Sequence, residues 1–141
     1  MASIEMVYGN PQVIKGIEGT TGQVFKAGDP LKTNAGKWII ATDGVIKGIA
    51  RGDASAVEGT ALEVELIDPS AVYSVRYKVG ATAQTLVGSI LDFNFAGTLG
   101  DLRLDESGAA TDVYCVALDS RDAVLTSGGR LLVRFLGALL T

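Results

Sequence analysis

The sequence predicts an all-β fold, a small single-domain β-barrel or β-sandwich of short strands and glycine-rich turns. Three observations indicate it. Apolar and polar residues alternate with the two-residue period of half-buried strands. Turn signals recur at intervals of about eight to twelve residues. Glycine supplies 18 of the 141 residues and is spread along the chain, as expected if it serves many turns. A chain of this length builds one core, so residues 1–141 are expected to form one domain.

The first third of the chain contains three short predicted strands and a hairpin. The strands cover residues 5–8, 13–17 and 23–26. The hairpin covers residues 37–51, and its Asp43-Gly44 is the residue pair that a two-residue type I′ turn favours. Isoleucines lie on both faces of this hairpin. We therefore expect the core to cover one face and a neighbouring chain or loop to cover the other.

A second hairpin is predicted over residues 62–79, where apolar residues alternate with charged and polar ones on both sides of an Asp-Pro-Ser-Ala turn. Closing that turn places Glu63 opposite Arg76 on one face and apolar residues opposite one another on the other face. The predicted apolar pairs are Leu66 with Tyr73, Val64 with Val75, and Leu62 with Tyr77. A slip of one residue would turn every buried side chain outward, so this pattern predicts a single register.

The second half of the chain is also predicted to form short strands. They cover residues 86–95, 101–104, 113–118, 123–125 and 131–136. In the last of these, Leu131, Val133 and Phe135 share the face expected to be in the core, opposite a face that carries arginines. Cys115 is the only cysteine and is expected to be a small core residue on a strand.

Composition restricts the partners. Apolar residues make up 48% of the chain and the mean hydropathy is +0.32, which indicates that some apolar surface is covered by other copies or by a partner. The net charge of −4, with no basic cluster, argues against nucleic acid. The first residues lack the pattern of a secretory signal, and the apolar C-terminal stretch is too short to span a bilayer. A soluble protein made in a cytoplasm, with no membrane partner, is expected.

The residue inventory argues against an enzyme and against a bound cofactor. There is no histidine, so every histidine-based triad and metal site is excluded. A single cysteine excludes an intrachain disulfide and a cysteine-based zinc site. No Gly-x-Ser-x-Gly sequence is present. A trimeric all-β nucleotide hydrolase of the deoxyuridine triphosphatase kind matches the length and class, but its uridine and phosphate motifs have no counterpart here.

Four weaker motifs have simpler interpretations. The Ala-Gly-Lys-Trp sequence lacks the remainder of a phosphate-binding loop, and the glycines at positions 16, 19 and 22 are interpreted as turn residues. A group of carboxylates offers ligands for a hard cation without the spacing of a calcium loop, and is interpreted as solvated surface. Its members are Asp101, Asp105, Glu106 and Asp112. The adhesion tripeptide Arg51-Gly52-Asp53 follows a strand and opens a loop, so it is interpreted as a turn.

One long stretch resembles a known family. Residues 25–75 read as a strand, a turn before Pro30, an Asp-Gly hairpin ending in Ile-Lys-Gly-Ile-Ala, a loop, and a strand leading into the Asp-Pro turn. This pattern resembles the head decoration, or capsid cement, proteins of tailed bacteriophages. The resemblance implies a small, often trimeric β-domain on the virion exterior. Such a domain binds the major capsid protein, bridges neighbouring capsid subunits and stabilises the head.

This resemblance directs attention to three candidate surfaces for contact with the capsid or between subunits. The first is the N-terminal stretch of residues 1–11, either an arm that orders on the capsid by strand addition or an ordinary edge strand. The second is the two-faced hairpin, and the third is the C-terminal stretch of residues 131–140, for which a core strand with a frayed end is the alternative. The candidate residues are Ile4, Met6, Tyr8, Pro11, Trp38, Ile40, Leu136, Leu139 and Leu140. A virion-associated domain that binds host glycans is the alternative function, and exposed aromatic rings would favour it.

Overall fold

The computed structural model describes residues 3–42, 46–78, 84–106, 112–122 and 128–136. The all-β prediction is confirmed: these residues form strands and one 3-10 turn, η1 (Gln84–Leu86), and no α-helix. The strands are β1 (Ile4–Tyr8), β2 (Val13–Ile17), β3 (Pro30–Asn34), β4 (Lys37–Ile40), β5 (Gly48–Ala50), β6 (Ala61–Leu66), β7 (Val72–Arg76), β8 (Ile90–Phe93), β9 (Leu104–Asp105), β10 (Val113–Leu118) and β11 (Arg130–Phe135).

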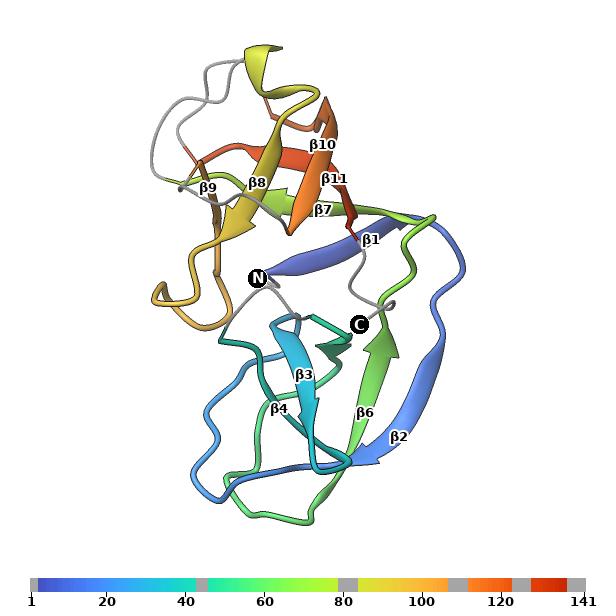
Figure 1. Cartoon of the computed structure of the whole chain (residues 1–141), viewed down its shortest axis with the longest axis vertical. Coiled ribbons are helices and arrows are strands. Elements are labelled where there is room, and N and C mark those ends of the chain that lie inside the picture. Colours follow the sequence, from blue (N-terminus) through green and yellow to red (C-terminus); the bar gives the residue numbers. More distant parts are fainter. Residues whose placement is uncertain (1–2, 43–45, 79–83, 107–111, 123–127, 137–141) are drawn as a thin grey trace.

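The strands form two antiparallel sheets. One has six strands in the order β1-β7-β11-β10-β8-β9, and the other has five in the order β2-β6-β5-β3-β4. In Figure 1 the six-stranded sheet occupies the upper part of the molecule and the five-stranded sheet the lower part. Neither sheet closes into a barrel, and the arrangement is compatible with a sandwich. The five-stranded sheet is continuous in sequence, since β2 to β6 all lie between β1 and β7.

The predicted hairpin over residues 62–79 is wrong, although its turn forms. The Ala71 N–H donates to the Asp68 carbonyl at 3.1 Å. However, β6 pairs with β2 and β5, whereas β7 pairs with β1 and β11, so none of the predicted cross-strand pairs occurs. The turn is the corner at which the chain leaves one sheet for the other. It is braced by the buried Tyr73, whose hydroxyl oxygen accepts a hydrogen bond from the Asp68 N–H at 3.0 Å.

The predicted hairpin over residues 37–51 is also replaced by a different pairing. Strand β3, which the sequence analysis did not identify, lies between β4 and β5 and pairs with both. The hairpin is instead β3–β4, joined by Ala35-Gly36 with φ of 53° and 79°. Two positive φ values are the requirement of a type I′ turn. Asp43-Gly44 lies outside the described residues.

The remaining strand predictions have mixed outcomes. Residues 113–118 and 13–17 form β10 and β2, and residues 5–8 and 131–136 largely coincide with β1 and β11. Residues 23–26 form no strand. Of the strand predicted over residues 86–95, only Ile90–Phe93 forms a strand, β8. Of the strand predicted over residues 101–104, only Leu104 belongs to a strand, β9. Residues 123–125 lie outside the described part of the chain.

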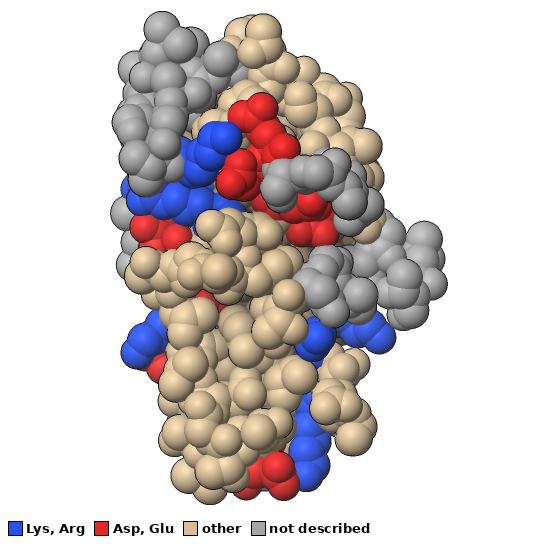
Figure 2. Space-filling view, turned by 60° about the vertical axis from the view of Figure 1, so that its left-hand side comes forward, with Lys and Arg blue, Asp and Glu red and all other residues tan. Residues whose placement is uncertain are grey.

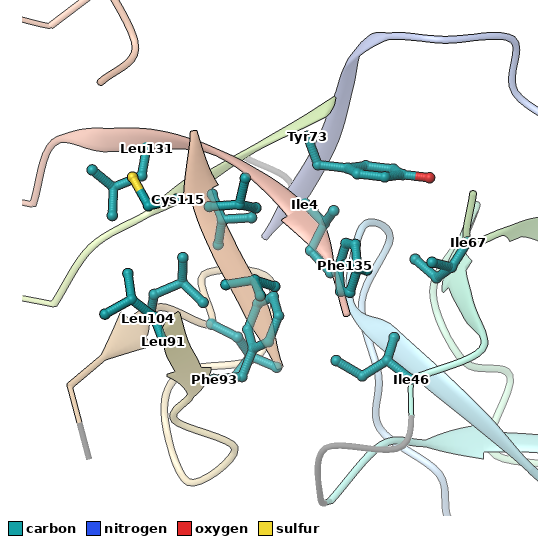
Figure 3. Packing of buried hydrophobic residues seen from close by; sticks show 14 of the residues in the cluster. Ile4, Ile46, Ile67, Tyr73, Leu91, Phe93, Leu104, Cys115, Leu131 and Phe135 are labelled. Atoms are coloured by element: carbon teal, nitrogen blue, oxygen red, sulfur yellow. The ribbon is translucent and has the colours of Figure 1, made fainter. Parts of the chain in front are cut away.

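The main hydrophobic core joins the two sheets. Ile46 and Ile67, at the ends of β5 and β6, are buried in one cluster with residues from the six-stranded sheet. Figure 3 shows these two side chains beside Phe135 and Tyr73. The rings of Tyr73 and Phe135 meet edge to face with centroids 5.1 Å apart. Cys115 is buried here, and so are Leu131, Val133 and Phe135 of β11, as the sequence predicted.

A smaller core lies within the five-stranded sheet. It contains Phe25, Leu31, Trp38, Ala50 and Val64, with Ile40, Ala54, Leu62 and Leu66 packed against it. An isolated parallel bridge between Glu18 and Trp38 links β4 to the residue that follows β2. This second core makes the five-stranded sheet a firm support for the surface that its edge strand β2 presents.

Candidate interaction surface

The N-terminal segment is an ordinary edge strand of the six-stranded sheet. Strand β1 pairs with β7 from Ile4, which lies opposite Val75, to Tyr8. Ile4 is 3% exposed and belongs to the main core, and Met6 packs against that core. Residues 3–8 are therefore part of the folded body, which is the alternative that the sequence analysis had set beside an arm.

Large apolar side chains are exposed along β1 and β2. We call this set of side chains the β1–β2 band; its members are Val7, Tyr8, Val13, Ile14 and Ile17, and the neighbours Val13 and Ile14 point to opposite faces of β2. Their exposed fractions range from 37% for Val7 and Ile14 to 64% for Tyr8. Both strands are sheet edges: within the described chain, β1 pairs only with β7 and β2 only with β6. An apolar strand with an open edge is a site at which another chain can add.

The predicted interface residues divide between core and surface. Trp38 is 7% exposed and belongs to the smaller core, and Ile4 belongs to the main core. Neither residue therefore lies on the surface. Ile40 is half-buried against the smaller core. Tyr8, Pro11 and Leu136 are exposed. Leu139 and Leu140 lie outside the described residues.

Most of the band was missed by the sequence analysis. Val13, Ile14 and Ile17 were assigned to a strand but not to a surface. The signal was available in the Val-Ile-Lys-Gly-Ile run, which is apolar on both faces although it lies near the start of the chain and beside an Asn-Pro turn. Two apolar faces on an edge strand leave one of them without a cover from the same chain.

A cleft of about 420 Å³ separates β1 from the five-stranded sheet. Its walls include Met6 and Val7 on one side and Ile49 and Ala50 on the other. Glu65 lines it as well, although this side chain is only 7% exposed. The Arg51 guanidinium donates to Glu65 Oε1 at 2.9 Å. Glu65 Oε2 is buried and makes no hydrogen bond within the described part of the molecule.

The other buried carboxylates serve the fold. Glu18 accepts hydrogen bonds from the Ser55 N–H at 2.8 Å and from its hydroxyl at 3.1 Å. Asp119 accepts from the Ser74 hydroxyl and from Arg121, and these hydrogen bonds, chiefly those of Arg121, hold the Asp119 pKa well below its usual range. These groups are satisfied by the chain itself, in contrast to Glu65 Oε2.

The carboxylates considered as cation ligands are dispersed. Asp101 pairs with Arg103 at 2.8 Å, and Asp105 and Glu106 both pair with Lys78. The hydrogen bond from Lys78 is the main reason that the Asp105 pKa is lowered. The remaining member, Asp112, is buried and accepts a hydrogen bond from a backbone N–H of β8. The described residues contain no group of three potential metal-binding side chains.

Charged side chains gather on one part of the surface. Figure 2 shows acidic and basic groups side by side over the upper part of this face, while the lower part is mostly uncharged except at its margins. A cleft of about 720 Å³ is lined by Lys26, Asp53, Arg76, Asp101 and Arg103. The ion pairs Lys26–Asp53 and Arg103–Asp101 lie along it, so positive and negative groups compensate one another.

The adhesion tripeptide is occupied by internal contacts. Arg51 pairs with Glu65, and Asp53 accepts a hydrogen bond from the Ala27 N–H at 2.9 Å and pairs with Lys26. Arg51 thus ties the loop to β6, and Asp53 ties it to the loop that precedes β3. This supports its interpretation as part of a turn.

No protein-family model matches the chain, and the search of curated proteins found no match. In the described part of the chain, no helix is long and apolar enough to cross a membrane.

Proposed function

We propose that this chain is a structural virion protein that binds the outer surface of an assembled phage capsid and bridges neighbouring major capsid subunits, acting as a homotrimer. The family resemblance in residues 25–75 suggests the class. The structural observation that supports it is the β1–β2 band, an apolar surface on two edge strands of a body with two packed cores. On this proposal the protein is not an enzyme.

The band suits lattice binding for energetic reasons. Complete burial of one valine, isoleucine or tyrosine side chain contributes about 1.5–3 kcal/mol, and the band residues begin only partly buried. A few such contacts give one copy modest affinity. A capsid lattice fixes several contacts at once, so an oligomer that bridges subunits binds far more tightly than one copy.

The charge arrangement is consistent with a scaffold role. Among the described residues, ion pairs such as Lys37–Glu58, Arg103–Asp101 and Arg130–Asp122 are formed within the chain. Compensated charge offers little drive toward the phosphates of a nucleic acid, and the net charge of −4 opposes it.

The test combines sedimentation with a matched pair of variants. Purified protein is mixed with empty heads from a panel of tailed phages, pelleted through sucrose, and quantified in the pellet. The wild type is expected to pellet with at least one head type. Ile14→Ser, within the band and on the face of β2 opposite Val13 and Ile17, is expected to weaken binding by about fivefold or more. Val57→Ser is the control, because Val57 is 60% exposed and lies outside the band.

The mass in solution provides an independent check. Light scattering after size exclusion is expected to give about 44 kDa, three times the 14.6 kDa of one chain. A monomer that pellets with no head type would contradict the proposal. Pelleting that responds equally to Ile14→Ser and Val57→Ser would show that the band is not the contact surface.

Exposed aromatic rings favour a second candidate function, binding of host glycans by a virion domain. Tyr8 is 64% exposed and Tyr114 is 39% exposed, and sugar-binding sites commonly use such rings. A glycan array with the isolated protein distinguishes the two functions. Binding that Tyr8→Ala or Tyr114→Ala abolishes would favour glycan recognition, whereas an array without signal would leave capsid binding as the proposal.

A further inference from the structure

Glu65 lines a cleft and carries a buried, unsatisfied acceptor oxygen. It lies on β6 opposite Val13 of β2 and Ile49 of β5. Val64 and Leu66 pack in or against the smaller core, so the alternation of a strand directs Glu65 to the opposite face, toward β1. Its Oε1 accepts from Arg51, while its buried Oε2 has no partner in the described structure. A buried carboxylate oxygen without a donor is costly, so a donor at this position would stabilise the site.

The cleft around Glu65 is lined by apolar residues and by the charged Glu5, Arg51 and Glu65. Met6, Val7 and Ile49 line it together with Pro11. Strand β1 forms one wall. On the side of β1 away from β7, the Ile4 N–H donates to the Gly28 carbonyl at 3.1 Å, and the rest of that edge pairs with no strand among the described residues. A strand added along that side would extend the six-stranded sheet over the cleft, with every second side chain directed into it. The site thus fits an extended segment in which one cationic residue is flanked by apolar residues two positions away.

The chain itself presents such a segment. Val13, Lys15 and Ile17 alternate along β2 and share one face, and all three are exposed. Lys15 lies opposite Glu63 in the sheet, yet it forms no ion pair or hydrogen bond with the described residues. The outer edge of β2 is also unpaired there. An unpaired cation between two exposed apolar side chains complements an unpaired carboxylate oxygen between apolar walls.

We infer that β2 of a second copy adds to the open edge of β1, placing the Lys15 ammonium on Glu65 Oε2 and Val13 and Ile17 against the apolar walls of the cleft. The inference rests on the proposed role as a self-assembling structural protein and names the surfaces that assemble. The contact joins two different surfaces, β2 of one copy and β1 of the next, so repetition of the contact can close a ring.

The experiment measures self-association of the full chain by light scattering and sedimentation velocity over a range of concentrations. Lys15→Gln and Glu65→Gln are each expected to weaken association at least about tenfold. The association constant of the double variant is expected to lie within about threefold of that of the weaker single variant, because each substitution removes the same contact. Lys15→Glu is expected to weaken association most, since it sets a second carboxylate against Glu65.

Two controls match the charge changes. Lys37→Gln and Glu58→Gln remove an exposed lysine and an exposed glutamate that pair with each other elsewhere, and are expected to change association less than about twofold. Thermal unfolding of each variant reports whether it folds. Lys15 is exposed, so the two Lys15 variants decide the outcome even if Glu65→Gln is poorly folded.

Two results would overturn the inference. One is a wild type that stays monomeric at about 200 μM, well above the concentration at which a specific oligomer should form. The other is an oligomer whose association constant is unchanged in Lys15→Gln and Lys15→Glu. A monomer that still pellets with phage heads would reject this contact and the trimer, and would leave capsid binding as the proposed function. An oligomer that depends on Lys15 but pellets with no head type would support the contact and contradict the function.

Discussion

Ser3 donates its hydroxyl hydrogen to Asp29 at 2.6 Å, and both residues are buried. Asp29 also accepts hydrogen bonds from the Lys26 and Gly100 N–H groups, while the Ser3 oxygen accepts one from the Leu102 N–H at 2.8 Å. One buried carboxylate thereby connects the start of β1, the loop before β3 and the loop before β9. These segments belong to both sheets, so Asp29 holds the two halves of the molecule together.

Asp29→Ala is expected to lower the free energy of unfolding by about 3 kcal/mol or more, because several buried donors lose their acceptor together. Urea denaturation at pH 7 measures this. Asp53→Ala is the matched control, since Asp53 is exposed and its removal should cost less than about 1 kcal/mol. Equal effects of the two substitutions would show that Asp29 is not a clamp.

Acid sensitivity is expected from Asp119. Its pKa in the folded protein is lowered from 3.8, first of all by hydrogen bonds from Arg121. The stabilisation is therefore fully present above the unfolded-state pKa near 3.8 and is lost as the pH falls from there through the lower pKa of the folded state. Asp119→Asn should reduce the free energy of unfolding by about 1–3 kcal/mol at pH 7 and by much less at pH 2. Denaturation at the two pH values tests this, and a difference that is independent of pH would contradict it.

The Cys115 thiol is expected to be inert in the folded protein. Cys115 is 0% exposed, and burial raises its pKa to about 11. At pH 8, labelling with a disulfide reagent should be at least about 100-fold slower in buffer than in guanidinium chloride, because the reactive thiolate is rare and covered. Glutathione serves as the reference thiol in both solvents. Rapid labelling in buffer would place Cys115 on an accessible surface.

Gly16 lies against the only tryptophan. A Cβ atom at Gly16 would come within 2.5 Å of Trp38 Cδ1, although the glycine has no positive φ. Gly16→Ala should therefore displace the indole ring, shift its fluorescence and cost about 1–3 kcal/mol. Gly52→Ala is the control, because a Cβ there meets nothing within 4 Å. If both alanine variants unfold and emit like the wild type, the packing of Trp38 beside Gly16 is wrong.

The alternation of residues within a single segment was enough to predict some of the strands. The six residues of β10 and the five of β2 were predicted with their observed bounds, and the buried face of β11 was identified from alternation alone. Alternation reports which side chains share a face, and that information is contained in a single strand. Strand β3 was missed because its turn is Ala35-Gly36 rather than the Asp-Gly or Asn-Gly pair that marks a type I′ turn in sequence.

Strand partners were predicted less well. Leu66 and Tyr73 satisfy every local requirement for a hairpin pair, yet they lie in different sheets. The glutamates of β6 do not face β7: Glu63 lies opposite Lys15 of β2 without an ion pair in the described structure, and Glu65 pairs with Arg51. Alternation does not specify which strand lies alongside, because several strands in an all-β chain offer the same pattern.

The sequence by itself determined the class of fold, the positions of most strands, and the faces that β6, β7 and β11 present to the core, because these follow from residue types a few positions apart. Only the tertiary structure decided that β6 and β7 part at the Asp68 corner, that β1 and β2 are edges, and that Glu65 faces a cleft. Those features depend on contacts between segments distant in sequence. Such contacts become favourable only when the two sheets pack over a common core, where the burial of apolar surface offsets the loss of chain entropy.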